Sequence, residues 1–179
     1  MIASRIYSMK RLACFVLIIC CLVSLECKAQ SHADNKEINV TYFLSSTCKI
    51  CQFYSIELNS LNQDYASKGI NFRGLFPGRL ETDSTVAEFG KVYSLPFPLK
   101  TDKYEEHRSL NATITPEVFV TNSGGEVFYH GRIDDAYFSV GKRRATVKNH
   151  ELRNVLDLLL QGEEVTSLHV PAVGCIIEK

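Results

Sequence analysis

The feature that most constrains this chain is a pair of cysteines, Cys48 and Cys51, placed where a predicted strand gives way to a predicted helix. Residues 38–44 are rich in β-branched and aromatic side chains, which is typical of a buried strand. Apolar residues then recur at helical spacing up to about Ser67, and Gly69 closes the predicted helix. The first cysteine therefore starts a helix, and the second lies one turn inside it.

That placement favours thiol chemistry. Free backbone N–H groups and the positive end of the helix dipole lie near a residue at a helix start, and both stabilise a thiolate. An unperturbed thiol has a pKa of about 8.5, so it is mostly protonated at neutral pH. We interpret Cys48 as the attacking nucleophile and Cys51 as the resolving thiol that releases the captured partner.

Two other readings of the cysteine pair stay open. Half of a zinc site needs two more ligands at suitable spacing, but the five histidines are scattered singly. A purely structural disulfide is the other alternative. We expect neither a metal nor a cofactor. Basic and acidic residues tie at 20 each, so no electrostatic footprint for nucleic acid is present.

The amino-terminal segment predicts export. A basic start precedes an apolar run over residues 12–25, which is shorter than the ~20 residues needed to cross a bilayer. We predict a signal peptide over residues 1–29, a flexible leader over 30–37 and one domain over 38–179, located in the periplasm or outside the cell. Membrane association would then require an uncleaved anchor or a lipid on Cys20 or Cys27.

Removal of residues 1–29 leaves three cysteines: Cys48, Cys51 and Cys175. Three cysteines cannot all pair within one chain. Since a domain of about 150 residues buries enough surface to fold without disulfides, this odd count indicates redox chemistry more than structural bridges.

Strand and helix patterns alternate along the rest of the domain. They predict a strand over 70–76, a helix capped by Thr82 or Asp83, a short strand over 97–101, a short helix over 105–110, a hairpin of 116–121 and 126–130, and a final helix that begins at Asn149 and ends near Gly162. This order indicates an α/β domain with a mixed sheet.

Four segments resemble the thioredoxin-like superfamily, and within it the secreted redoxins related to the alkyl hydroperoxide reductase/thiol-specific antioxidant group. They are residues 42–61 with the Cys-x-x-Cys helix, 115–120, 129–135 and 173–177. The resemblance implies a thioredoxin-like fold, with a central mixed β-sheet flanked by helices. Thioredoxin itself carries tryptophan where Thr47 stands and Gly-Pro where Lys49 and Ile50 stand.

The resemblance also implies a site and an activity. It implies a cis peptide bond between Thr115 and Pro116 beside the Cys48 sulfur, with the Thr115 backbone exposed for strand-like pairing with a partner chain. The implied activity is thiol–disulfide exchange outside the cytoplasm, on protein thiols and disulfides, with a separate electron donor.

Two further residues carry open alternatives. Cys175 is either an alternative resolving thiol for Cys48 or a small apolar residue in a terminal strand. Glu57 shares the apolar helix face six residues after Cys51. It is either a carboxylate that tunes a thiol or relays a proton, or a boundary residue bonded to backbone or solvent. Arg132, with the aspartates that follow it, is expected to form structural pairs.

A thiol peroxidase with antioxidant activity is the main rival function. Ser45 stands three residues before Cys48 as in such enzymes, but Thr41 occupies the position of their proline. In such enzymes an arginine comes from the region that residues 115–116 occupy here. Cleavage of the peroxide O–O bond needs the positive charge of that arginine. A copper chaperone of the same fold is less favoured, because its cysteines are usually spaced by three residues and His130 is the only plausible third ligand.

Overall fold

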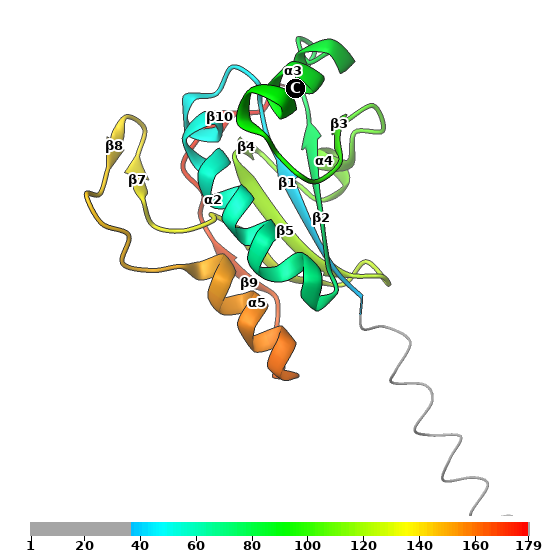
Figure 1. Ribbon diagram of the computed structural model, residues 1–179, viewed down its shortest axis with the longest axis vertical. Coiled ribbons are helices and arrows are strands. Elements are labelled where there is room, and N and C mark those ends of the chain that lie inside the picture. The colour runs from blue at the N-terminus through cyan, green and yellow to red at the C-terminus, as the bar shows by residue number, and fades with distance from the viewer. Residues whose placement is uncertain (1–36, 179) are drawn as a thin grey trace, which may run out of the picture. The chain divides into compact units, whose positions relative to one another are not determined.

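The computed structural model describes residues 37–178, so the predicted signal peptide lies outside the described residues. The segment from Glu37 onward forms a compact unit of its own. Its centre is a six-stranded mixed sheet in the order β3-β2-β1-β5-β6-β9 (Figure 1). The strands are β1 (Ile38–Phe43), β2 (Ile70–Phe76), β3 (Leu99–Thr101), β5 (Glu117–Asn122), β6 (Val127–Gly131) and β9 (Leu168–Val170). β5 runs antiparallel to both β1 and β6, whereas the β1–β2, β2–β3 and β6–β9 pairs are parallel.

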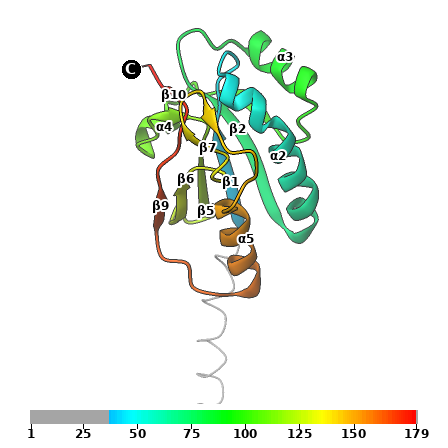
Figure 2. The ribbon, with the colours of Figure 1, turned by 90° about the vertical axis from the view of Figure 1, so that its left-hand side faces the viewer.

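Helices cover both faces of this sheet. Figure 2 shows α2 (Lys49–Tyr65), α3 (Asp83–Tyr93) and α5 (Glu151–Gln161) on one side and the short α4 (Glu106–Ser109) on the other. A 3-10 turn, η2 (Ala66–Lys68), follows α2. Two small sheets complete the unit: β4 (Ile114–Thr115) pairs with β10 (Cys175–Ile176), and β7 (Tyr137–Ser139) pairs with β8 (Lys142–Arg143).

Side-chain alternation along β5 divides the interior into two cores. Val118 and Val120 pack in the larger core, under α2, α3 and α5. Phe119 points to the opposite face and packs in a smaller core with Phe43 and Ile177. Because the central strands are covered on both faces, every residue of β1 except the half-buried Asn39 is buried, including the polar Thr41.

The sequence predicted this architecture closely. The predicted strands 38–44 and 70–76, the helix closed by Gly69 in the left-handed conformation, the Thr82 cap and the hairpin are all present. One cap was wrong. α5 begins after His150, while the Asn149 side chain donates instead to the Asp135 carboxylate at 3.1 Å.

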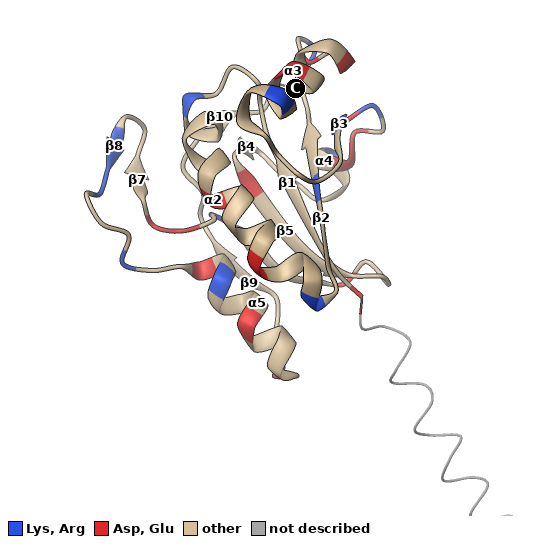
Figure 3. Ribbon diagram, viewed as in Figure 1, with Lys and Arg blue, Asp and Glu red and all other residues tan. Residues whose placement is uncertain are grey.

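Charges of both signs lie on α2, α3 and α5 (Figure 3). Part of this pattern joins two helices, since Arg153 of α5 pairs with Glu57 at 2.7 Å and with Asp64 at 2.6 Å on α2. Within residues 37–178, no helix is both long and apolar enough to cross a bilayer.

A buried hydrogen bond fixes α2 to the segment that follows β6. The Tyr54 hydroxyl, one turn beyond Cys51, donates to Asp134 Oδ1 at 2.6 Å. The same oxygen accepts the Ala136 backbone N–H at 2.8 Å. This bond therefore holds the first turns of α2, and with them the cysteine pair, against the rest of the domain.

We expect Tyr54→Phe to lower the free energy of unfolding by about 1–3 kcal/mol, because it leaves a buried carboxylate short of one donor. Urea denaturation measures the change. The matched control is Tyr104→Phe, since Tyr104 is 89% exposed, and its effect should stay within about 0.5 kcal/mol. Equal effects for the two variants would contradict this role of Tyr54.

Candidate functional site

The two cysteines lie where the sequence predicts them, at the amino-terminal end of α2. Cys48 is the N-cap residue, with extended backbone angles, and Cys51 lies within the first turn. Both are buried, with exposed fractions of 2% and 0%. The Thr115–Pro116 peptide bond is cis, as the resemblance implies. As a thiol, Cys48 Sγ donates to the Thr115 carbonyl oxygen at 3.3 Å.

The surroundings of Cys48 favour its thiolate. A hydrogen bond from the Cys51 thiol is the largest cause, and it acts with weaker contributions from the Cys175 thiol and the backbone N–H groups of Cys51 and Ile50. Together these outweigh the cost of burial and lower the pKa of Cys48 from 9.0 to about 5. At neutral pH this sulfur is therefore a thiolate.

Cys51 has the opposite character. Burial raises its pKa well above the ordinary value, and the hydrogen bond to Cys48 and the negative charge there raise it further. The Ser45 backbone N–H, which donates to Cys51 Sγ at 3.4 Å, opposes this only in part. The site thus holds one ionised and one protonated sulfur side by side.

The carboxy-terminal segment completes the site, which is a role that the sequence left open. In strand β10, Cys175 pairs in register with Thr115 of β4. We expected the Thr115 backbone to be exposed. It is instead buried under this segment. A side chain at Gly174 would collide with the Thr115 carbonyl group, so glycine permits the close approach.

Cys175 itself is exposed, so the alternative of an apolar filler in a terminal strand is wrong. Partial burial and its hydrogen bond to the Cys48 thiolate raise the pKa of Cys175 to about 11. Three thiols therefore converge on one point, and Cys48 is the ionised one. A hollow of about 230 Å³ opens beside them, lined in part by Thr47, Thr115 and Cys175.

Glu81 supports the loop before Cys48, and sequence analysis missed it. Its Oε1 accepts the Ser46 backbone N–H at 2.8 Å and the Ser45 hydroxyl at 3.0 Å. The one signal in the sequence is the position of Glu81 shortly after the Pro77-Gly78 turn. It indicates that the loop between β2 and α3 returns to this end of the sheet.

Glu57 is not part of this cluster. Its carboxylate pairs with Arg153 because α5 packs beside α2 and supplies the guanidinium. The main causes of the cysteine pKa shifts are other groups. The expected structural pairs after β6 are present, with Arg132 on Glu151 and Asp135 on Arg144.

Two of the residues considered for the rival functions, Thr41 and His130, make their contacts with groups other than the cysteines. Thr41 Oγ1 accepts from Arg73 Nε at 2.9 Å, and that guanidinium pairs with Glu106 rather than with a cysteine. Among residues 37–178, the ligand atoms grouped with His130 come from Glu117 and His169 and not from a cysteine. The structure therefore does not bring the cysteine pair and His130 together as ligands of one copper ion.

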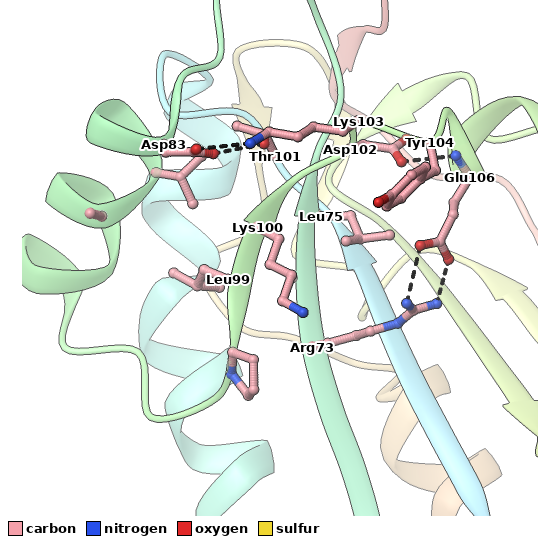
Figure 4. A pocket seen from close by; sticks show the side chains of 14 residues that line it. Arg73, Leu75, Asp83, Leu99, Lys100, Thr101, Asp102, Lys103, Tyr104 and Glu106 are labelled. Carbon is pink, nitrogen blue, oxygen red and sulfur yellow. Dashed lines mark hydrogen bonds and ion pairs between the residues drawn. The ribbon is translucent and has the colours of Figure 1, made fainter.

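A larger cavity of about 690 Å³ lies between α3, β3 and α4 and contains no cysteine. Figure 4 shows that charged side chains on its wall satisfy one another, Arg73 with Glu106 and Lys103 with Asp83. The cavity is therefore separate from the cysteine cluster.

Comparison with solved structures identifies the fold. A hypothetical protein from Sinorhizobium meliloti is 27% identical, with 79% of each chain covered and a TM-score of 0.69. A thioredoxin-family thiol:disulfide interchange protein from Chlorobium tepidum is 17% identical, with 70% of this chain and 81% of that chain covered and a TM-score of 0.51. The chain has a thioredoxin-like fold.

An uncharacterized conserved protein from Geobacillus kaustophilus shares the thioredoxin-like fold at 23% identity, with 81% of this chain and 78% of that chain covered and a TM-score of 0.69. No family model and no curated protein matches the sequence. The place of the chain among the secreted redoxins of this superfamily stays a prediction.

We expect the ultraviolet absorbance of the reduced protein to show one thiolate that titrates near pH 5, and Cys48→Ser to remove that step. Cys51→Ala should raise the midpoint more than Cys175→Ala, because the Cys51 hydrogen bond is the larger cause. Folding lowers this pKa, so the unfolded chain binds the extra proton between pH 5 and 9, and reduced protein gains stability as pH rises through that window. A first step near pH 9 would contradict the thiolate.

We also expect Gly174→Ala to speed alkylation of Cys48 by iodoacetamide, because the added methyl group displaces β10 from Thr115. Trypsin cleaves after Lys49 and leaves Cys48 and Cys51 on different peptides, so mass spectrometry measures each rate separately. The control is Glu178→Gln, an exposed change in the same segment. An unchanged Cys48 rate in Gly174→Ala would show that β10 does not limit access.

Proposed function

We propose that this chain is an extracytoplasmic thiol–disulfide oxidoreductase, with Cys48 as the nucleophile and Cys51 as the resolving thiol. The observation that carries the proposal is the asymmetry of the pair. A thiolate at the start of α2 lies beside a thiol whose proton is retained. The thiolate is the reactive form of cysteine, and the neighbouring thiol has to stay protonated until it is needed.

The exchange follows from this asymmetry. The Cys48 thiolate attacks one sulfur of a partner disulfide, which forms a mixed disulfide and releases the other partner sulfur as a thiolate that takes up a proton. Forming that bond removes the negative charge on Cys48, which is one of the causes that hold the proton on Cys51. Cys51 then passes its proton to solvent and its thiolate attacks Cys48 Sγ. The Cys48–partner bond breaks, the partner sulfur leaves as a thiolate that takes up a proton, and the Cys48–Cys51 disulfide remains.

A dithiol donor outside this chain would restore the reduced form, and the same steps in reverse would oxidise a partner dithiol. The low pKa of Cys48 stabilises the reduced state. The couple should therefore be more oxidising than one with an unshifted thiol. The name of the Chlorobium tepidum neighbour, a thiol:disulfide interchange protein, agrees with this class of reaction.

Partner binding would require a change in the carboxy-terminal segment. A partner chain that pairs with the Thr115 backbone takes the position that Cys175 occupies in β10. We propose that β10 yields this edge when a substrate protein docks. An exported location agrees with the apolar amino-terminal segment, and protein thiols and disulfides are the proposed substrates.

We expect the segment from Gln30 to Lys179 to catalyse insulin reduction by dithiothreitol, and Cys48→Ser to abolish turnover because serine offers no thiolate. Cys51→Ser should accumulate a mixed disulfide with insulin, which gel electrophoresis without reductant detects. Cys175→Ser is the matched control and should keep turnover.

Turnover that survives Cys48→Ser would refute the assignment of the nucleophile. If Cys175→Ser loses turnover while Cys51→Ser keeps it, Cys175 and not Cys51 is the resolving thiol. Peroxide consumption without insulin reduction would favour the thiol peroxidase instead.

A further inference from the structure

A second group of potential ligands lies on the face of the sheet opposite α2. Glu117 of β5, His130 of β6 and His169 of β9 each offer one ligand atom, and these atoms all lie within 4.8 Å of one another. None belongs to the cysteine site. We propose that the three side chains bind a divalent first-row transition metal of the zinc class.

The sheet itself brings the three residues together. β6 and β9 pair in parallel, with His130 in register with His169. The next position, Gly131, has φ = +137°, and a side chain there would collide with the Val170 backbone, so this glycine allows β9 to approach. Glu117 precedes Phe119 by two residues and shares its face, and Phe119 is in register with His130.

Ring contacts hold the imidazoles in place. The His130 and His169 rings are stacked, with centroids 4.2 Å apart and planes 6° apart. Phe119 stacks on the other face of His130 at 5.2 Å. The Phe119 contact holds the His130 ring, but a metal lies in the plane of each ligand imidazole, so the His169 ring has to turn out of the stack before both rings can bind one ion.

One polar atom at the site has no partner. His130 Nδ1 is buried and makes no hydrogen bond among the described residues. Glu117 Oε1 lies 3.9 Å away, which is too far for a hydrogen bond. The other carboxylate oxygen, Oε2, accepts the Thr113 backbone N–H at 3.1 Å, so an outer contact orients the carboxylate with Oε1 toward the His130 ring.

The donor set fits this class of metal. Two imidazoles and one carboxylate bind zinc in catalytic sites and leave one position open. Bonds of about 2.1 Å in a tetrahedral arrangement place ligand atoms about 3.4 Å apart. Binding therefore requires the ligand atoms to move closer together and one imidazole ring to rotate out of the stack. His169 can make both changes most easily, because it is exposed and lies on the edge strand β9.

Zinc binding tests the proposal, measured by competition with a coloured chelator. The parent protein is the segment from Gln30 to Lys179 with Cys48, Cys51 and Cys175 replaced by serine, so that no thiol competes. We expect one Zn²⁺ per chain. We expect His169→Ala to weaken binding by at least about tenfold, since loss of an outer contact alone costs that much. Glu117→Gln should also weaken it, because the anionic ligand is lost.

His150→Ala is the matched control, because His150 is an exposed histidine outside the cluster, and it should bind zinc as the parent does. Zinc should raise the melting temperature of the parent but not that of His169→Ala, which also shows that the variant folds. Absence of zinc binding in the parent, or equal binding in His169→Ala, would overturn the site. Neither outcome bears on thiol exchange, because the parent contains no reactive thiol.

Discussion

The Thr115 backbone is the contact on which the cysteine site depends. Its carbonyl oxygen accepts from Cys48 Sγ, and its strand pairs with Cys175 of β10. A thiolate cannot donate, so ionisation of Cys48 ends the first of these bonds and leaves the sulfur to accept from Cys51 and Cys175. Under the proposed exchange, a Cys48–Cys51 disulfide removes that charge, and the contact that holds Cys175 weakens. The proposed exchange would therefore link the position of β10 to the redox state of the pair.

The sequence predicted the parts of this site that local patterns determine. A β-branched strand, an abrupt break and a helical repeat place Cys48 at a helix start without reference to the rest of the chain. The strong turn over residues 122–125 likewise specifies the hairpin that places Glu117 and His130 on neighbouring strands. The cis form of Pro116 followed from the resemblance alone, because the surrounding residues do not select it.

The parts that failed depend on contacts between distant segments. Glu57 has the position expected of a tuning residue on α2, but Arg153, 96 residues later, captures its carboxylate. Asn149 has a strong capping side chain, but the Asp135 carboxylate competes for it. β10 has only two residues and no periodicity, so its pairing with Thr115 depends on the space that Gly174 leaves. No local pattern encodes these choices.

Strand β5 separates the two sites for which we propose a function. Successive side chains of a strand point to opposite faces, so Val118 and Val120 support the α2 core while Glu117 and Phe119 face the histidines. Thiols bind transition metals strongly, and a metal on Cys48 would block disulfide exchange. Glu117 directly follows the proline beside Cys48 in the chain, but its side chain lies on the other face of the sheet. The sheet therefore separates the proposed metal ligands, two imidazoles and a carboxylate, from the cysteines.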